Sequence, residues 1–391
     1  TEPLTMVEGV HALPPGSLLE IDCDLNSRST NWWTLSGAVR NADGQALPDQ
    51  QLGTEVSRAV REQLMADVEV GLFLSGGIDS TAIALACERT GVYPRAITLG
   101  FEGDETVDSV LATITAAKLG MQSHLRIFKR SDLLGELDAW LACQDQPSVD
   151  GLNVYLVSKT AKELGLRVVL SGIGGDEVFG GYAGFRRARS AARLAGIARW
   201  TGLAPLIRHL PVFGERSRRW PRIVELLGGA VPPYFATRSL RGVATTRDAL
   251  GFGWSDIEPI PADALDEYRA NHDRMPLLTA IALDESAFYL RNVLLRDADQ
   301  MGMAHSVEIR VPLLDARLAA LSIAGLSDDR QRGAHGKGAL LRAMSSKWLD
   351  TIASQSKRGF EVPLRKWMRS EETTLHLRTL IGDDSGASNN P

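Results

Sequence analysis

The sequence has 391 residues, of which 44% are apolar and 23% charged, with a formal net charge of −5. This is the composition of an ordinary globular protein and excludes a general electrostatic attraction to nucleic acid or to an anionic membrane. No apolar run approaches the roughly 20 residues of a membrane span, and the three cysteines form no CxxC pair, so a cytoplasmic location without a zinc or redox motif is predicted.

The first residues of the chain offer little material for a core. The stretch GVHALPPGSLLEID (9–22) predicts a turn and a short strand, and NWWTLSG (31–37) predicts an exposed aromatic segment. Helical spacing of apolar residues begins only with EVSRAVREQLMAD (55–67). We therefore separate residues 1–54 from the domain that follows.

Short apolar runs then alternate with helical patterns. Such runs predict strands at 68–74, 95–101 and 166–172, with a further strand at 124–128, and helices are predicted at 80–91, 108–120 and 153–165. Strands that are almost wholly apolar are typical of parallel sheets covered on both faces. The alternation predicts an α/β fold, with a central parallel sheet and helices on both faces.

The character of the sequence changes after Tyr182. From Arg186 to Arg222 there are ten arginines and one acid, Glu215. This stretch is either a solvated or salt-bridged helical face or a patch for an anionic partner.

The main domain is expected over residues 55–372. Within it, residues 186–285 are predicted to form a helical, Arg-rich insertion, followed by a helical C-terminal region. The polar tail at 373–391 is expected to be disordered.

The motif SGGIDS (75–80) joins the first predicted strand to a helix. The first N–H groups and the dipole of a helix attract anions, and glycines let the backbone approach a pyrophosphate closely. The lysine of the P-loop pattern is missing, and Asp79 lies inside the loop instead. A carboxylate beside phosphates can hold Mg²⁺, and Ser75 and Ser80 can donate hydrogen bonds. The motif thus predicts a loop that binds pyrophosphate and Mg²⁺.

This loop resembles that of the N-type ATP pyrophosphatases, which cleave ATP to AMP and pyrophosphate. Further stretches resemble signatures of the asparagine synthetase family, namely LSGIGGDEVFGGY (170–182), LLRDADQMGMAHSVEIRVPLLD (294–315) and SKRGFEVPLRKWM (356–368). Residues 9–22 resemble the segment that joins that family's glutaminase and synthetase domains, so the resemblance covers about residues 8–370. It implies that residues 1–54 are a joining segment left from the boundary of a missing glutaminase domain. It implies an adenine-nucleotide α-hydrolase-like fold that uses ATP and Mg²⁺.

The resemblance also implies roles for the matching residues. Asp79 and Asp176 would hold Mg²⁺, Lys357 would neutralise charge on the α-phosphate, and Glu308 would orient or deprotonate an incoming amine. Asp176, Glu308 and Lys357 are therefore the catalytic candidates. The candidates for binding ATP and its pyrophosphate are Leu74, Ser75, Gly76, Gly77, Asp79, Ser80, Thr98 and Gly172.

Other polar residues near these motifs keep two interpretations. Arg310 and Asp315 can form a structural ion pair. Asp150 and Asn153 can face the substrate or cap the next helix. His305 is expected to be a packed structural residue.

One departure from the family is the absence of a glutaminase domain. Residue 1 is Thr, whereas that domain carries an N-terminal cysteine nucleophile, and residues 1–54 are too few to build the domain. No glutaminase activity is expected of this chain. Ammonia would come from solution, from a separate glutaminase subunit, or from a lost N-terminal domain.

A second departure is Ile173, which stands where the best-known bacterial asparagine synthetases have an acid. Relatives that use the same adenylation close a β-lactam ring or a lasso-peptide macrolactam. Ile173 therefore gives weight to a different carboxylate, including a peptide substrate.

The predicted function is ATP-dependent amide synthesis through an acyl-adenylate, with asparagine synthesis from aspartate as the first expectation and cyclisation as the alternative. The partners would be a small-molecule carboxylate and ammonia or another amine, with a homodimer as one possible assembly. A non-catalytic binding subunit is the further alternative, disfavoured because Asp79, Asp176 and Lys357 are all present. Sulfur insertion into nucleic acid is disfavoured because cysteine pairs and basic domains are absent.

Overall fold

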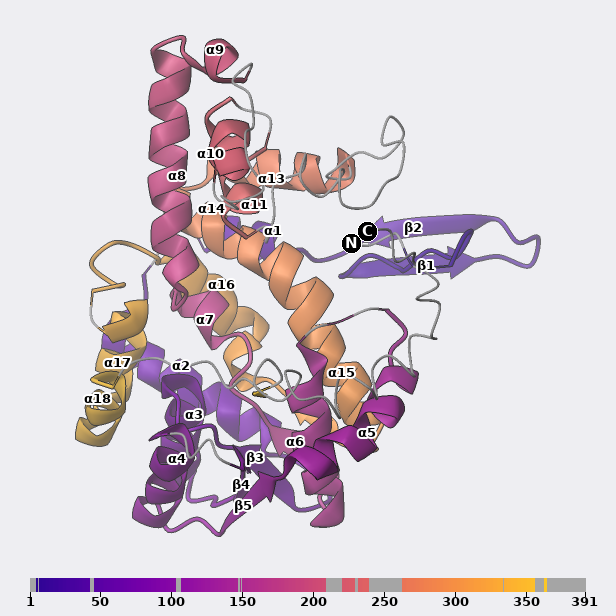
Figure 1. Cartoon of the computed structure of the whole chain (residues 1–391), viewed down its shortest axis with the longest axis vertical. Coiled ribbons are helices and arrows are strands. Elements are labelled where there is room, and N and C mark those ends of the chain that lie inside the picture. The colour runs from indigo at the N-terminus through magenta and orange to yellow at the C-terminus, as the bar shows by residue number, and fades with distance from the viewer. Residues whose placement is uncertain are drawn as a thin grey trace, which may run out of the picture. The chain divides into compact units, whose positions relative to one another are not determined.

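The structure of the chain, a computed structural model, describes residues 5, 7–42, 46–102, 107–146, 148, 150–208, 220–228, 231–238, 262–332, 334–355 and 362–363. The chain divides into two compact units (Figure 1). The first comprises Thr1–Val56, Ile173–Asn292 and Leu313–Ser346; the second comprises Ser57–Gly172, Val293–Pro312 and Lys347–Pro391. Each unit is described by itself. No helix among the described residues is long and apolar enough to cross a membrane.

The second unit contains a five-stranded parallel sheet. In spatial order the strands are β5 (Ser123–Phe128), β4 (Arg95–Phe101), β3 (Val70–Phe73), β6 (Val168–Leu170) and β7 (Glu308–Arg310). The four predicted strands are confirmed. β7 was not predicted, because it has only three residues and two of them are charged.

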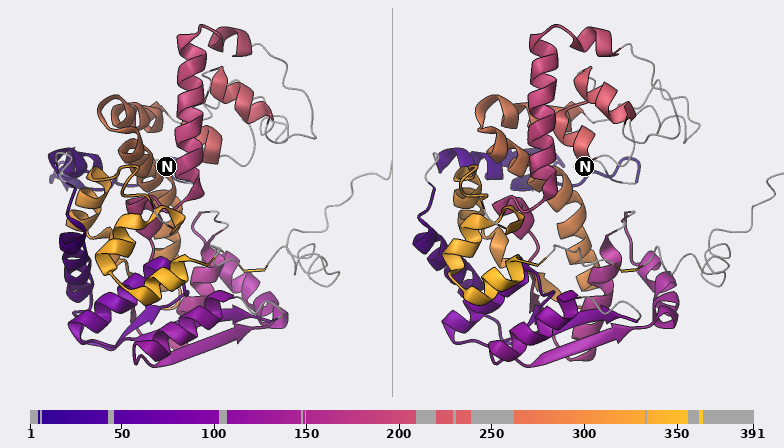
Figure 2. Two further views of the ribbon diagram at one scale, coloured as in Figure 1. Left: turned by 90° about the vertical axis from the view of Figure 1, so that its left-hand side faces the viewer. Right: turned by 60° about the vertical axis from the view of Figure 1, so that its left-hand side comes forward.

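Helices pack against this sheet. The described helices of the unit are α3 (Ile78–Thr90), α4 (Val107–Lys118), α5 (Arg130–Ala142), α6 (Gly151–Glu163), α15 (Arg296–Met303) and α18 (Lys347–Ala353). Alternate residues of β4, Ile97, Leu99 and Phe101, enter one core with residues of α5, α6 and α15. α3 and α4 also lie against the strands (Figure 2). The predicted α/β fold with a parallel sheet is confirmed.

The first unit is mostly helical. It contains α1 (Leu35–Asn41), α7 (Gly175–Phe179), α8 (Ala183–Trp200), α9 (Ala204–Arg208), α10 (Trp220–Leu227), α11 (Pro233–Arg238), α13 (Ala262–Arg274), α14 (Leu277–Asp284), α16 (Ala316–Ala324) and α17 (Gly338–Met344). α2 (Asp49–Gln63) and a π-helix (Glu285–Leu295) include residues of both units.

The N-terminal part of the first unit begins with a hairpin. β1 (Ser17–Ile21) pairs antiparallel with β2 (Ser27–Asn31), which confirms the strand predicted within residues 9–22. The aromatic segment predicted to be exposed at 31–37 is exposed at Trp32 and half-buried at Trp33. Trp32 is 72% exposed, but α1 begins at Leu35 because the Thr34 side chain accepts a hydrogen bond from the Gly37 N–H at 3.0 Å.

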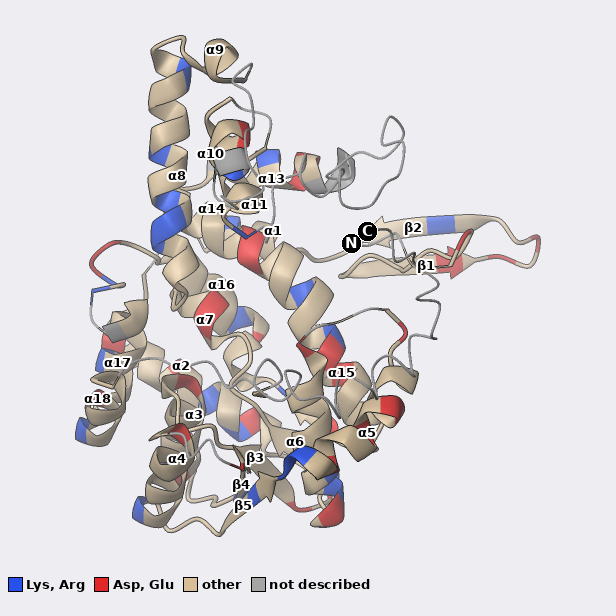
Figure 3. Ribbon diagram, viewed as in Figure 1, with Lys and Arg blue, Asp and Glu red and all other residues tan. Residues whose placement is uncertain are grey.

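The Arg-rich stretch begins on α8. Lys and Arg residues mark that helix along its length (Figure 3). Arg186, Arg187 and Arg193 are exposed, whereas Arg189 forms an ion pair with Asp328. The stretch thus contains both solvated and salt-bridged arginines.

Candidate functional site

The sheet order reverses between β3 and β6. From β3 the chain proceeds to β4 and β5 on one side and then returns to β6 and β7 on the other. Loops that leave the carboxyl ends of parallel strands at such a switch point are where open α/β sheets bind ligands. SGGIDS follows β3 and the Ser171–Gly172 turn follows β6, so the topology alone brings these two segments together.

The two serines of SGGIDS close the loop on itself. The Ser80 hydroxyl lies 3.1 Å from the Ser75 hydroxyl and accepts a hydrogen bond from the Ser75 N–H at 3.2 Å. It also donates to the Gly77 carbonyl at 3.3 Å. α3 then starts at Ile78 with Gly77 as its N-cap and Asp79 in its first turn. A helix N-terminus in this shape presents backbone N–H groups and partial positive charge to an anion.

The glycines around the loop have different reasons to be glycine. Gly76 has a φ of +75°, and a Cβ there would lie 2.2 Å from the Asp108 carbonyl oxygen of α4. A Cβ at Gly172 would lie 3.0 Å from the Cβ of Asp79 and 3.0 Å from the Ser80 N. Among the described residues, a Cβ at Gly77 would meet only the Ser75 Oγ, at 3.4 Å. The loop therefore packs closely at Gly76 and Gly172 and leaves space at Gly77. This shape forms a cradle in which a ligand group can approach the backbone.

Leu74 and Thr98 connect the loop to the neighbouring strand. The Thr98 hydroxyl, on a residue only 2% exposed, donates to the Leu74 carbonyl at 2.8 Å, and the Leu74 N–H donates to the Ile97 carbonyl at 2.9 Å. These bonds extend the β3–β4 pairing up to the loop. The adenine contacts expected at Leu74, Thr98 and Gly172 stay a prediction.

Asp176, in the first unit, lies in the first turn of the five-residue helix α7. Its Oδ1 is 2.6 Å from the ammonium of Lys337, a residue that is only 2% exposed. A Cβ at Gly181 would lie 2.1 Å from that Oδ1 and 2.1 Å from the Lys337 Cε. The ion pair is thus enclosed by the GGY turn of the same motif. Lys337 was not predicted, because its partner is distant in sequence and the lysine belongs to no recognised motif.

Glu177, beside Asp176, is also buried. It is 1% exposed, and its Oε1 accepts a hydrogen bond from the Tyr182 hydroxyl at 2.7 Å. Burial raises the pKa of Glu177 to about 7. The pattern GGDE contained this residue, but adjacent acids give no indication of which one is buried.

Glu308 lies apart from the SGGIDS segment. It is the first residue of β7, so its register partner is Val168 at the start of β6, and β6 separates β7 from β3. Its side chain is 57% exposed and pairs with the Arg310 Nε at 2.7 Å. Arg310 further donates to the carbonyls of Gln63 and Met65, both at 2.7 Å. The structural ion pair expected for Arg310 therefore exists, but with Glu308 as partner.

The remaining candidates have local roles. The Asp315 carboxylate accepts from the Leu318 N–H at 3.0 Å and caps α16. Asp150 occupies the N-cap position of α6 without a side-chain capping bond, and Asn153 accepts from the Val154 N–H. His305 is 8% exposed and its ring lies 4.4 Å from that of Tyr155, as expected of a packed residue.

Lys357 and the tail at 373–391 lie outside the described residues.

The donor chemistry of the two aspartates fits Mg²⁺. This ion keeps several waters and is usually held by one or two carboxylates together with substrate phosphates. Among the residues that the structure describes, no three His, Cys, Asp or Glu side chains gather as a metal site. Asp79 and Asp176 each lie at the start of a helix that follows a glycine turn, and both stay the predicted carboxylate ligands of the ion.

A parallel sheet with a glycine-rich strand-to-helix loop at its switch point defines a nucleotide-binding α/β protein of the adenine-nucleotide α-hydrolase type. Residues 51–390 match the sequence model of the family described as asparagine synthase. The chain therefore belongs to the asparagine synthase family.

Curated relatives cover nearly the whole chain. It is 26% identical over 388 residues to asparagine synthetase [glutamine-hydrolyzing] 1 of Bacillus subtilis, covering 95% of this chain and 58% of the relative. It is 29% identical over 397 residues to a putative asparagine synthetase [glutamine-hydrolyzing] of Mycobacterium bovis, covering 97% and 59%. It is 24% identical over 409 residues to amidase chry2 of Gibberella zeae, covering 93% and 60%. The chain spans about three fifths of the length of these relatives.

Proposed function

We propose that this protein makes an amide bond at the expense of ATP through an acyl-adenylate. A carboxylate oxygen attacks the α-phosphorus of ATP, and the bond to the β-phosphate oxygen breaks to release pyrophosphate. An amine then attacks the acyl carbon, losing a proton, and AMP leaves. The first expected substrate pair is aspartate and ammonia, which would give asparagine.

The single observation that supports this most strongly is the SGGIDS cradle at the β3–β6 switch point. Its open backbone at Gly77 and the N-terminus of α3 suit a pyrophosphate, which is both the largest charge of ATP and the leaving group. Mg²⁺, when bound by Asp79 and Asp176, would neutralise the phosphates. Leu74, Ser75, Gly76, Ser80, Thr98 and Gly172 would form the remainder of the nucleotide site.

Lys357 and Glu308 keep their proposed roles at the acyl centre. Lys357 would stabilise charge on the α-phosphate, and Glu308 would orient or deprotonate the amine. For Glu308 the ion pair with Arg310 provides an internal check. If the pair acts as a unit, Arg310→Gln is expected to slow the attack of the amine as Glu308→Gln does. If Glu308 is only an exposed surface residue, Arg310→Gln should leave this step unchanged.

The decisive experiment is a screen for pyrophosphate release, with ammonia as amine and single carboxylates as acceptors. Release that depends on aspartate, together with formation of asparagine and AMP, would support asparagine synthesis. Asp79→Ala serves as the blank, because it removes the proposed metal ligand. Pyrophosphate release that no carboxylate stimulates, in a preparation that binds ATP, would refute the proposal.

The second candidate is an amide-forming cyclase acting on a larger carboxylate. Two observations favour it, namely Ile173 in the SGIGGDE turn and the similarity to a relative described as an amidase. An apolar side chain there cannot accept a proton from ammonia or pair with a charged amino acid. If aspartate stimulates no pyrophosphate release while a peptide carrying its own amine does, the cyclase assignment replaces asparagine synthesis.

The ammonia donor belongs to the same proposal. The matched relatives from Bacillus and Mycobacterium are described as glutamine-hydrolyzing. For this chain we propose free ammonia, a separate glutaminase or a glutaminase domain N-terminal to these residues as the source. Glutamate formed from glutamine by this chain alone would contradict that part of the proposal.

A further inference from the structure

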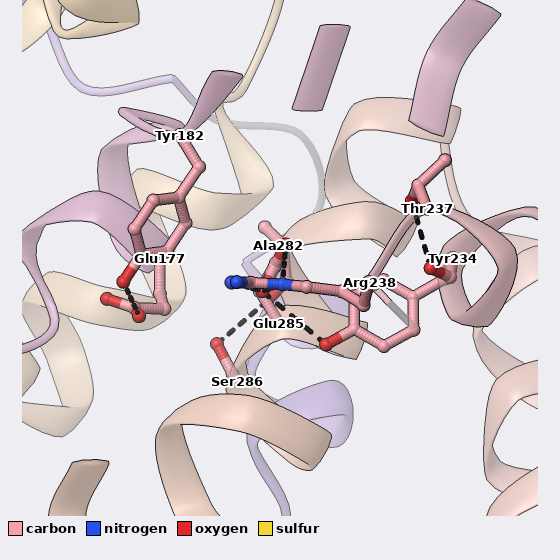
Figure 4. Close-up of polar contacts among 8 residues, drawn as sticks. All are labelled: Glu177, Tyr182, Tyr234, Thr237, Arg238, Ala282, Glu285 and Ser286. Atoms are coloured by element: carbon pink, nitrogen blue, oxygen red, sulfur yellow. Dashed lines mark hydrogen bonds and ion pairs between the residues drawn. The ribbon is translucent and has the colours of Figure 1, made fainter. Parts of the chain in front are cut away.

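Arg238, the last residue of α11, makes most of its contacts with residues of other elements. Its guanidinium binds both carboxylate oxygens of Glu285, with the Nε donating at 3.0 and 2.9 Å and the Nη2 completing the pair (Figure 4). Glu285 is the first residue of the π-helix and its side chain is 2% exposed. The Tyr234 hydroxyl donates to the same carboxylate at 3.4 Å. Arg238 is therefore the cation that balances a buried acid.

The same guanidinium lies against two aromatic rings. Its Cζ is 4.1 Å from the centre of the Tyr289 ring and 4.8 Å from that of Tyr182. The two rings meet edge to face, 6.2 Å apart. A planar guanidinium can stack on a ring and bind a carboxylate with its edge at the same time, which an ammonium cannot do. Arg238 thus connects α11, the π-helix and the residue that begins α8, since Tyr182 is the N-cap of that helix.

Tyr182 extends these contacts to α7. Its hydroxyl donates to the buried Glu177 (Figure 4). The neighbour of Glu177 in α7 is Asp176. The contacts therefore run from Glu285 through Arg238 and Tyr182 to Glu177. None of these residues except Tyr182 lies in the GGY turn that encloses the Asp176–Lys337 ion pair.

α7 cannot hold its own orientation. It has five residues, and it is bounded by two glycines in the left-handed conformation, Gly174 with a φ of +91° and Gly180 with a φ of +74°. A helix this short has almost no stability without tertiary contacts. The direction of the Asp176 carboxylate is consequently set by its ion pair with Lys337 and by what packs on α7, and the hydrogen bond from Tyr182 to Glu177 is a polar contact that helps to fix the helix.

We propose that Arg238 is a positioning residue for Asp176, acting through Tyr182 and Glu177. This inference rests on the proposed function, because it assumes that Asp176 serves Mg²⁺ and ATP. It assigns the helical insertion a role in the reaction: α11 supplies the guanidinium that holds the ring of Tyr182, and thereby the α7 turn, in place. A change at Arg238 should then affect the Mg²⁺ dependence of the protein through Tyr182 and Glu177.

The test uses Arg238→Lys, which keeps the charge but loses the bidentate, stacked geometry. Arg193→Lys is the matched control, because Arg193 is exposed on α8. Binding of ATP is measured by calorimetry over a series of Mg²⁺ concentrations, and denaturant unfolding is followed in the same preparations. We expect the Mg²⁺ concentration for half-maximal ATP binding to rise at least about fivefold in Arg238→Lys and to stay unchanged in Arg193→Lys.

Tyr182→Phe provides a second variant that keeps the ring and removes only the hydroxyl. It should raise the Mg²⁺ requirement in the same direction as Arg238→Lys, and the double variant should be no worse than the more affected single one. If both variants unfold more readily but bind ATP with the wild-type Mg²⁺ dependence, Arg238 is only an anchor and the inference is wrong. Because the readout is binding, this outcome is distinct from failure of the proposed function, which is shown by wild-type protein that binds ATP but releases no pyrophosphate.

Discussion

Among single residues, Gly76 is under the most specific constraint in the SGGIDS loop. It combines a left-handed backbone with the close approach of the Asp108 carbonyl, 2.2 Å from where a Cβ would lie. Gly76→Ala should therefore cost the strain of the left-handed region, about 1–2 kcal/mol, and in addition displace α4 from the loop. We expect a lowered denaturation midpoint together with a loss of ATP binding.

The matched control is Gly91→Ala. Gly91 has the same φ of +75° at the end of α3, but a Cβ there would have no atom of the described part of the chain within 4 Å. It should show the backbone strain alone, with ATP binding retained. Equal effects of the two substitutions on ATP binding would mean that the contact between Gly76 and Asp108 does not shape the loop.

A second prediction for a single residue concerns Glu177 and the pH dependence of the unfolding free energy. Burial raises its pKa from 4.5 to about 7, so the folded protein holds this proton more tightly than the unfolded chain. The stabilisation is complete below about pH 4.5 and is lost as the pH rises to about 7, a change of roughly 3 kcal/mol. Glu177→Gln mimics the protonated acid and should flatten the dependence of unfolding free energy on pH in that window.

Urea denaturation between pH 4.5 and pH 7.5 measures this slope. Exposed Glu20 on β1 offers the comparison Glu20→Gln, which should leave the slope as in the wild type. If Glu177→Gln retains the full wild-type slope, another group carries the proton in this range.

Sequence patterns identify residues of the site only where the chemistry is local. SGGIDS could be recognised because its glycines, its serines and Asp79 are contiguous and follow a strand. Lys337 and Arg238 could not be recognised from the sequence. Each pairs with a carboxylate that is distant in sequence and is brought close only by folding, Asp176 for Lys337 and Glu285 for Arg238. For Ser75 and Ser80 the residues were recognised, but their mutual hydrogen bond depends on the backbone path between them.

At the scale of elements, α18 shows how a short helix is fixed to the sheet domain. The Trp348 Nε1 donates to the Thr115 hydroxyl of α4 at 2.9 Å, and the Lys118 ammonium lies 4.8 Å from the centre of the Trp348 ring. Trp348→Phe and Thr115→Val should each cost about 1–2 kcal/mol of unfolding free energy. The double variant should lose less than the sum, since both remove one hydrogen bond.

Denaturant unfolding of the four proteins in this cycle provides the coupling energy. A coupling near zero would mean that the Trp348 hydrogen bond adds nothing to the packing of α18. The same helix precedes the SKRGF motif, with Lys357 four residues after its last residue, Ala353. If Trp348→Phe releases pyrophosphate more slowly than the wild type under conditions in which both proteins are fully folded, α18 is linked to the motif.

Helices and strands could be predicted from the sequence where their own residues carry the pattern of that structure. β3, β4 and β6 were recognised from apolar, β-branched runs, and β4 even with its observed bounds of 95–101. β5 was a further strand predicted at 124–128, in a run that also contains His124 and Arg126. β7 forms because Glu308, Ile309 and Arg310 add to the free edge of β6 by backbone pairing, a cause that the three residues do not display. α1 likewise depends on the cap at Thr34, within a segment that was expected only to be an exposed aromatic stretch.

At the scale of the whole molecule, the two proposed Mg²⁺ ligands belong to different units, Asp79 to the second and Asp176 to the first. Their joint action can be tested by a double-mutant cycle on pyrophosphate release, with Asp79→Asn and Asp176→Asn. Each single change should lower kcat/KM by about 100-fold or more, which is typical of losing one preorganised charged group. Groups that act as a unit are not additive, so the double variant should be little worse than the poorer single one.

Exposed Asp299 on α15 provides the control Asp299→Asn, which should leave the rate unchanged. Losses that multiply in the double variant would show that the two aspartates act independently, and the assignment of one shared metal would have to be abandoned even if amide synthesis itself were demonstrated.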